Sequence, residues 1–417
     1  MTRSEATGTS VRALDAPLRA LRRTTRTGRM AALTAVAAWC VVVAFVARAC
    51  IPRSLDLRVY RDAASVVLHG GAPYAVTFTS QHFAFTYPPF ALFFFAPLTA
   101  LNLHTAIWAF DATGAACLVV ALAICARTET TWSWTRCWVL AALIGGVSCL
   151  ALEPLRSTLL NGQVNLVLLA CIVVDLFAVP PRRRGFLIGL AAAVKLTPLV
   201  FVLYLLVTGE RRAAARACAT FAGVTGLLWL VRPADSTTFW LHQAFSPSRR
   251  GASRSAANQS WWGLVGRLPA SAGWLRPTVW LVLCAVTVCV GYLVARRCVT
   301  AGRRLDALLA ITVTGLLVSP ISWTHHWSWL AVVPVALLAV RPRPAAVTAA
   351  LWLLLAVAIA APYGWHVTGA GSVVPGFSLL GAGALLLATM AVVELRGTRP
   401  APMAPQPAAM LEGRATG

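Results

Sequence analysis

Long apolar segments recur along the chain, and short polar turns separate them. The alternation is regular in the second half, where the expected spans are Ala217–Val231, Leu275–Ala295, Ala307–Val318, Trp327–Val340, Ala345–Ala361 and Phe377–Val393. Segments of this kind approach the roughly 20 residues that cross a bilayer as a helix. The pattern predicts an all-α polytopic membrane protein with about 11–12 transmembrane or re-entrant helices.

The apolar pattern covers almost the whole chain, so we expect one transmembrane domain over residues 30–395. The flanking residues 1–29 and 396–417 are expected to be disordered cytoplasmic tails. The first span, Met30–Ile51, is too long for the core of a signal peptide and should remain as an anchor. Two long polar stretches are expected as outer loops, residues 52–89 and 232–274.

Two segments do not fit a simple count of crossings. Four apolar segments lie between the loop of Asp56, expected outside, and Arg182, expected inside, where an odd number is required. Phe90–Leu101 is short enough to be re-entrant. Gly185–Val207 has arginine at both ends and is broken at Lys195, which predicts a hairpin with this lysine near its tip. Broken backbone at membrane depth needs cover from protein or a wet cavity, so we expect a cavity here.

Composition agrees with a membrane protein, because 59% of residues are hydrophobic and only 12% are charged, against about 25% charged in soluble domains. The net charge of +23 comes from arginine clusters between apolar segments, which mark cytoplasmic turns. These are Arg12–Arg29, Arg182–Arg184, Glu210–Arg216, Arg296–Arg304 and Arg341/Arg343. No basic stripe is interleaved with aromatics, so nucleic acid is not an expected partner. The cysteines lack zinc-site spacing, and no metal is expected.

Asp56 follows the first span and opens a stretch, Asp56–Leu68, that predicts a short amphipathic helix on the outer membrane surface. A carboxylate there could accept a proton from an acceptor hydroxyl as a general base. The alternative is that Asp56 only caps the helix. Position alone leaves both open.

His325 and His326 lie beside tryptophans in an expected outer turn, where they could donate to a phosphate or simply belong to an aromatic belt. Lys195 is the only lysine. A lysine within an apolar segment is costly and usually functional. It could neutralise a phosphate, reach the membrane surface with its long side chain, or pair with Asp175 or Asp111.

Further polar residues gather on the outer side. Glu153 and Asn161–Asn165 form an outer turn, and the long loop carries Arg249 and Arg250. Arginine on this side indicates an anionic headgroup or phosphate, although a merely solvated loop explains it equally. The chain has no Gly-rich phosphate loop, nucleophile elbow or HExxH motif, which fits a sugar donor that is not a nucleotide.

Six motifs, in order from about residue 52 to 340, resemble one known family. They are Asp56–Tyr60, Thr86–Pro89, Glu153-Pro154 with Asn161–Asn165, Ala193–Pro198, Asn258–Ser260 and Ser319–Trp327. The chain resembles the actinobacterial polyprenyl-phosphate-mannose-dependent α-(1→2)-mannosyltransferases, glycosyltransferase family 87 of the GT-C superfamily. It looks most like the enzymes that branch lipomannan and lipoarabinomannan. The enzymes that elongate phosphatidylinositol mannosides are similar but less so.

The resemblance implies a β-mannosyl phosphate donor on a polyprenol, a mannosylated glycolipid acceptor and inversion to an α-linked product. It also implies a site at the outer face of the plasma membrane and no required cofactor. Asp56 would be the general base. The residues implied to hold donor phosphate are Lys195, His325 and His326, with Arg249 and Arg250 added from their place in the outer loop. Those implied to line the sugar or acceptor site are Tyr60, Tyr87, Glu153, Gln163, Asn165, Gln259 and Trp323.

Two other functions are weighed against an enzyme. A glycolipid or sugar transporter should gather its ionisable residues near the middle of the bilayer. Only Asp111, Asp175 and Lys195 are candidates for that depth, whereas the other polar candidates gather at one face. A structural subunit of a cell-wall assembly would leave this gathering unexplained. The asymmetry favours a glycosyltransferase.

Overall fold

The computed structural model describes residues 54–244, 257–268, 273–338, 342–360 and 378–396. The expected first span, both tails, and Arg249 and Arg250 lie outside the described residues. Within them, a two-stranded antiparallel hairpin, β1 (Thr77–Phe78) and β2 (Phe83–Ala84), accompanies a fold that is otherwise helical. The all-α class is therefore confirmed.

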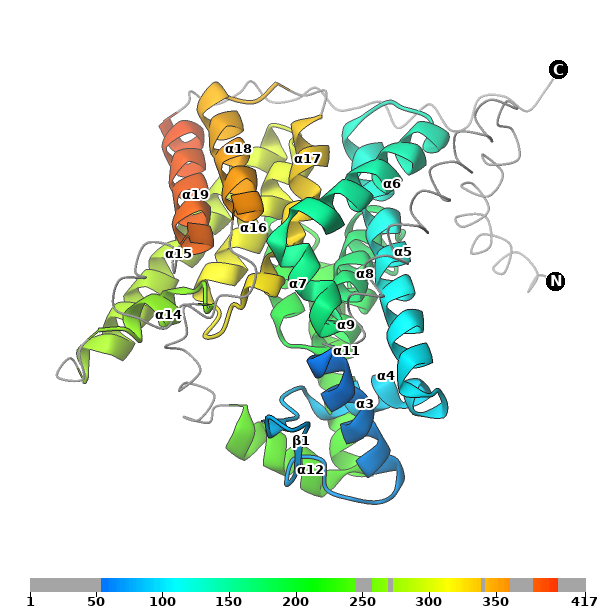
Figure 1. The fold of residues 1–417 in the computed structure, drawn as a ribbon. Coiled ribbons are helices and arrows are strands. Elements are labelled where there is room, and N and C mark those ends of the chain that lie inside the picture. Colours follow the sequence, from blue (N-terminus) through cyan, green and yellow to red (C-terminus); the bar gives the residue numbers. More distant parts are fainter. Residues whose placement is uncertain (1–53, 245–256, 269–272, 339–341, 361–377, 397–417) are drawn as a thin grey trace, which may run out of the picture.

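The described helices are coloured in chain order in Figure 1. The first half contains α3 (Leu55–Leu68), α4 (Pro89–Phe95), η1 (Ala96–Ala100), α5 (Leu103–Glu129), α6 (Trp134–Ala151), α7 (Glu153–Asn161), α8 (Asn165–Phe177), α9 (Phe186–Val194), η2 (Thr197–Leu199) and α10 (Val200–Val207). The second half contains α11 (Arg211–Val231), α12 (Pro233–Thr237), η3 (Thr238–Gln243), α14 (Trp261–Val265), α15 (Leu275–Thr300), α16 (Arg304–Val318), η6 (Thr324–Ala331), α17 (Val332–Leu337), α18 (Ala345–Ala360) and α19 (Ser378–Arg396).

Five described helices are long and apolar enough to cross a membrane, namely α5, α6, α11, α15 and α19. The pair α7 and α8 would add a sixth span, bent by 115°. α11 and α15 turn much of their apolar surface outward, and Leu230 of α11 is 84% exposed. Apolar side chains on the outside are stable in lipid but not in water, so the fold is that of a multi-pass membrane protein.

The segment formed by α4 and η1 explains why the chain crosses the membrane an odd number of times between Asp56 and Arg182. α4 is 7 residues long and continues as the 3-10 helix η1, too short to span a bilayer. The remaining passes before Arg182 are α5, α6 and the bent pair of α7 and α8. At the end of α5, Glu129 Oε1 accepts from Leu305 N (2.9 Å) at the start of α16, which joins two ends expected on the cytoplasmic side.

The interrupted segment around Lys195 forms the predicted hairpin. α9 ends where Lys195 adopts an extended backbone (φ −150°, ψ 131°), and η2 and α10 follow. The two flanks meet, because Arg184 Nη1 lies 2.5 Å from Glu210 Oε1. The segment therefore enters and leaves on one side, with Lys195 at the far end.

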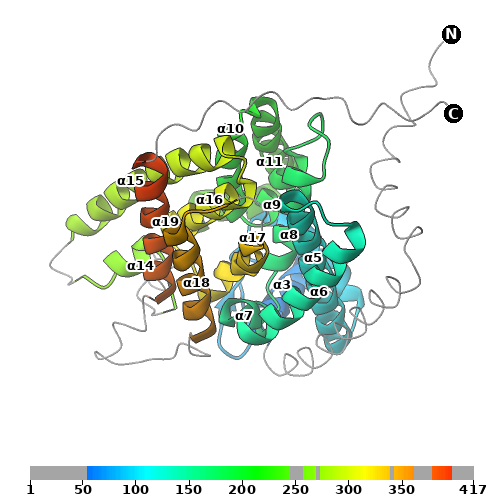
Figure 2. The same ribbon diagram turned by 90° about the horizontal axis from the view of Figure 1, so that it is seen from above.

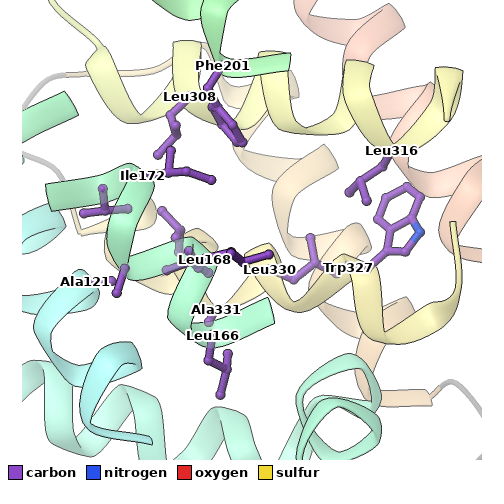
Figure 3. Packing of buried hydrophobic residues seen from close by; sticks show 14 of the residues in the cluster. Ala121, Leu166, Leu168, Ile172, Phe201, Leu308, Leu316, Trp327, Leu330 and Ala331 are labelled. Carbon is purple, nitrogen blue, oxygen red and sulfur yellow. The ribbon is translucent and has the colours of Figure 1, made fainter. Parts of the chain in front are cut away.

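The core lies where α8, α10, α16 and η6 face one another. Figure 3 shows Ile172 of α8, Phe201 of α10 and Leu308 of α16 on one side of this region, and all of these side chains are buried. Seen from above, α8 and α17 lie near the middle and α15 lies at one edge (Figure 2). Lys195 lies next to the start of η6, because its Nζ is 3.2 Å from Nε2 of His326.

Candidate active site

Asp56 lies in the first turn of α3, and its carboxylate is bonded across the fold. The neighbouring Leu57 and Tyr60 are buried, so α3 packs against protein as well as lying at a surface. Asp56 Oδ2 accepts from Gln163 Nε2 at 2.5 Å. Ser54, not Asp56, is the N-cap residue. The side chain of Asp56 is therefore used for a tertiary contact with a residue 107 positions away, which removes the capping alternative.

Gly162 allows this contact. It ends α7 with a left-handed backbone (φ 66°), which a residue with a side chain rarely adopts. A Cβ at this position would lie 2.6 Å from Cβ of Leu57. Because glycine has no Cβ, α3 packs directly on the turn, and Gln163 comes next to Asp56.

Two tyrosines continue the hydrogen bonds behind Gln163. Tyr87 Oη donates to Gln163 Oε1 (3.1 Å), and Tyr60 Oη donates to Tyr87 Oη (2.7 Å). Burial raises the pKa of Asp56, while the hydrogen bond from Gln163 and the charge of Lys195 act in the opposite direction. Asp56 is therefore a stronger base than an exposed aspartate.

Lys195 is 7% exposed and has two close polar partners. Its Nζ donates to Asn165 Oδ1 (2.9 Å) and lies 3.2 Å from His326 Nε2. It also stands 5.2 Å from the centre of the Tyr87 ring. The buried ammonium does not reach a surface. Asp175 instead accepts from Gly185 N and Ile188 N, both at 2.9 Å, so it caps α9 rather than pairing with Lys195.

The histidine pair opens η6, and its backbone is held by polar side chains. The carbonyl of His325 accepts from Asn165 Nδ2 (2.8 Å) and Thr158 Oγ1 (3.1 Å). Burial, with the charge of Lys195, holds the pKa of His325 and of His326 well below its usual range, so both imidazoles are neutral. Within the described residues, His325 Nε2 is buried without a hydrogen-bond partner. A buried polar atom without a partner is costly and indicates a ligand.

A cavity of about 310 Å³ opens beside His326 and Asn165. Its polar end also includes Ser319 and Ser322. Its apolar wall is formed by Leu168, Ile172, Val200, Phe201, Leu316, Val318 and Trp329, some of which Figure 3 shows. The break at Lys195 predicted a cavity here. Its wall residues could not be identified beforehand, because they resemble any other buried apolar residue.

Other predicted site residues support the turn before η6. Glu153 Oε1 accepts from Thr324 Oγ1 (3.4 Å), and Trp323 forms a β-bridge with Asn258. Gln259 is 0% exposed, its N–H donates to Ser322 O (2.7 Å), and its Oε1 accepts from Leu380 N (3.1 Å). These contacts tie the turn together, and sugar binding by these residues stays a prediction.

Thr158 is a site residue that sequence reasoning missed. Its signal was a hydroxyl on the buried face of α7, and that face could be recognised only in the fold. As for metals, no group of three His, Cys, Asp or Glu side chains in the described part of the chain is arranged to bind an ion.

Comparison with known proteins identifies close similarities. The model of glycosyltransferase family 87 matches residues 85–320. The polyprenol-phosphate-mannose-dependent α-(1-2)-phosphatidylinositol mannoside mannosyltransferase of Mycobacterium tuberculosis is 33% identical over 313 residues, 70% of this chain and 72% of that protein. A Mycolicibacterium smegmatis enzyme named for a pentamannoside acceptor is 35% identical over 282 residues, 66% of this chain and 67% of the relative. No solved structure matches the chain significantly.

Proposed function

Because the chain belongs to glycosyltransferase family 87, we propose that it transfers mannose from polyprenyl-phosphate mannose to a mannosylated glycolipid. The names of the similar mycobacterial enzymes support the donor and an acceptor of the phosphatidylinositol mannoside class. The sequence motifs predict instead an acceptor of the lipomannan or lipoarabinomannan class. Both kinds of acceptor present a mannose hydroxyl on a lipid anchor, and the experiment below separates them.

One observation carries the proposal. Lys195 is buried and bonded to Asn165 and His326, and these two partners line an apolar cavity. A cation beside an apolar cavity suits a lipid phosphate, whose head is anionic and whose tail is a hydrocarbon. The polyprenyl chain would lie along the cavity wall.

The same geometry relates donor and acceptor. Lys195 stands over the ring of Tyr87, and the hydroxyl of Tyr87 bonds to Gln163, which bonds to Asp56. The phosphate and the base would therefore lie on two sides of one sugar site. Asn165 and Gln163 supply its polar lining, and Tyr87 stands behind Gln163.

In the proposed reaction, Asp56 takes the proton of the acceptor hydroxyl as its oxygen attacks C1 of mannose. The bond from C1 to the phosphate oxygen breaks, and polyprenyl phosphate leaves with the electron pair. Lys195 and the imidazoles of His325 and His326 stabilise the negative charge that collects on this phosphate. A single displacement of a β-mannosyl phosphate inverts C1 and gives an α-linked mannose.

We place the site on the outer face of the plasma membrane, where the arginine orientation signals put Asp56 and the histidine turn. The pairs Arg184–Glu210 and Arg343–Asp306 join turns expected on the cytoplasmic side, which supports this orientation.

The test is a transfer assay in membranes of a host that makes no such glycolipid. Labelled polyprenyl-phosphate mannose is supplied with either a phosphatidylinositol mannoside or lipomannan, and product linkage is determined by NMR. We expect α-(1→2)-linked mannose on at least one acceptor. Absence of transfer to both, or transfer from GDP-mannose without the lipid carrier, would overturn the proposal.

A further inference from the structure

Three hydrogen bonds run in one direction from Tyr60 to Asp56. Tyr60 Oη donates to Tyr87 Oη at 2.7 Å, Tyr87 Oη donates to Gln163 Oε1 at 3.1 Å, and Gln163 Nε2 donates to Asp56 Oδ2 at 2.5 Å. Tyr60, Tyr87 and Gln163 are all buried. The sequence predicted that these three residues line the sugar site. Their hydrogen bonds indicate that they also position Asp56.

The direction of these hydrogen bonds matters because the two ends of a glutamine amide differ. Its oxygen only accepts hydrogen bonds, and its nitrogen only donates them. With its single proton, the hydroxyl of Tyr87 can donate to Gln163 Oε1 while it accepts from Tyr60. The ionised carboxylate of Asp56 only accepts, so it draws Nε2 toward itself, and the hydroxyl of Tyr87 satisfies the Oε1 at the other end of the amide. The reversed amide would place an oxygen against the carboxylate.

The tyrosines themselves are held by packing. The ring of Tyr60 stacks on Phe95, with 4.5 Å between ring centres and 14° between planes, and it meets the ring of Tyr87 edge-on at 4.9 Å. The turn at Gly162 fixes the backbone before Gln163. The amide is thus anchored at its oxygen end by residues that need not touch either substrate.

We propose that Tyr60 and Tyr87 are positioning residues that anchor the oxygen end of the Gln163 amide and so hold its nitrogen against Asp56. Gln163 then donates to one carboxylate oxygen and leaves the other for the acceptor hydroxyl. This inference rests on the proposed function, because it gives Asp56 the role of general base. It adds that the pKa of Asp56 depends on Tyr60 and Tyr87, which do not need to contact the substrates.

Two neighbours oppose the effect of burial on the pKa of Asp56. Burial raises the pKa of Asp56, and the N–H of Gln163 lowers it by stabilising the ionised form. Lys195 acts in the same sense as Gln163. Burial and, in turn, the charge of Asp56 raise the pKa of Tyr60, whose phenol also interacts with Gln163. Among packed neighbours, α4 and η1 carry no ionisable side chain. On α7, Glu153 interacts with Arg156 and Thr324.

Tyr87→Phe tests the proposal, because it keeps the ring beside Lys195 and removes only the donor to Gln163. The oxygen end of the amide then loses its anchor, the hydrogen bond from Gln163 to Asp56 weakens, and the pKa of Asp56 rises. We expect the acid limb of the pH profile of kcat/KM to move up by about one pH unit, roughly tenfold in rate on that limb. On the alkaline plateau the rate should return to within about twofold of the wild type. Gln163→Glu, which cannot donate to Asp56, should shift the limb further.

Tyr74→Phe is the matched control. Tyr74 is buried in the same aromatic cluster, and its hydroxyl donates to the backbone carbonyl of Tyr87 (2.7 Å) rather than into the chain toward Gln163. It should leave the acid limb in place. Thermal unfolding in detergent confirms that each variant is folded.

An unmoved acid limb in folded Tyr87→Phe, or an equal shift in Tyr74→Phe, would overturn the inference while leaving the proposed function intact. Lack of mannose transfer by the wild-type chain would instead overturn the proposed function. The two failures are therefore distinguishable.

Discussion

Nζ of Lys195 lies 3.2 Å from Nε2 of His326, although 131 positions separate the two residues in sequence. The contact forms because the helical segment breaks at Lys195 and because η6 begins just before His326. The buried ammonium of Lys195 has two polar neighbours, the neutral imidazole of His326 and the side-chain amide of Asn165. Asp56 acts on Lys195 through its charge but is not among its hydrogen-bond partners, and an anionic phosphate at this point would pair with the ammonium directly.

Asp56→Asn is expected to abolish transfer, because the amide cannot accept the proton of the acceptor hydroxyl. Loss of a general base typically lowers the rate by about 10²–10⁴-fold. Donor binding should persist, since Lys195 and the imidazoles are unchanged. The measurement is initial rate and donor affinity in the same membranes.

Asp62→Asn provides a control on the same helix. Asp62 is partly exposed and pairs with Arg61 at 3.4 Å, so its loss should leave transfer within about twofold. Activity retained in Asp56→Asn would remove Asp56 as the base.

The sequence predicted much of the fold because hydrophobic segments report membrane spans directly. It also predicted the break at Lys195, since Lys-Leu-Thr-Pro cannot continue an apolar helix. It did not predict the 3-10 helix that carries the histidine pair, where the expected span begins as η6. Nor could it show that α4 ends after two turns, because apolar phenylalanines continue a helix equally well.

The site was predictable only where a residue type is unusual for its surroundings. A lone lysine, a paired histidine and an aspartate after a span meet this condition, and the structure brings all three together. Gln163 illustrates the limit. Its residue type suits a sugar ligand, but its bond to Asp56 depends on the turn at Gly162 and on α3, which only the tertiary fold brings together.

Lys195→Met is expected to weaken use of the donor. Methionine keeps much of the volume but removes the charge, so the phosphate loses its main cation. We expect kcat/KM for the donor to fall by about 10²–10³-fold, with the KM for the acceptor nearly unchanged. Steady-state kinetics with each substrate varied in turn provides the test. A defect confined to the acceptor would contradict the phosphate role of Lys195.

Thr197→Trp is expected to discriminate between donors by the length of their lipid. Thr197 lines the cavity and is itself exposed, so an indole there can enter the cavity without crowding the core. The KM for a long-chain polyprenyl donor should rise by about tenfold, and that for a short-chain donor should change little, because only the long chain needs the filled space. Competition between the two donors measures the ratio.

Thr278→Trp is the matched control, since Thr278 is exposed on α15 and does not line the cavity. It should leave the preference between donors unchanged. An equal rise for both chain lengths in Thr197→Trp would show that the cavity does not hold the lipid tail.

Transfer is expected to continue after the membranes are washed with EDTA, with a rate within about twofold of the untreated enzyme. The reason is chemical, because a phosphate leaving group already stabilises its charge and Lys195 lies beside it. Burial lowers the pKa of Lys195 to about 7, and a bound phosphate favours its protonated form. The histidines face the same phosphate and lack a carboxylate or thiolate partner in the described part of the chain that would complete a metal site. The measurement compares transfer before chelation, after it, and after readdition of Mg²⁺ or Mn²⁺. Loss of activity that either ion restores would show that a divalent cation takes the role assigned here to Lys195 and the imidazoles.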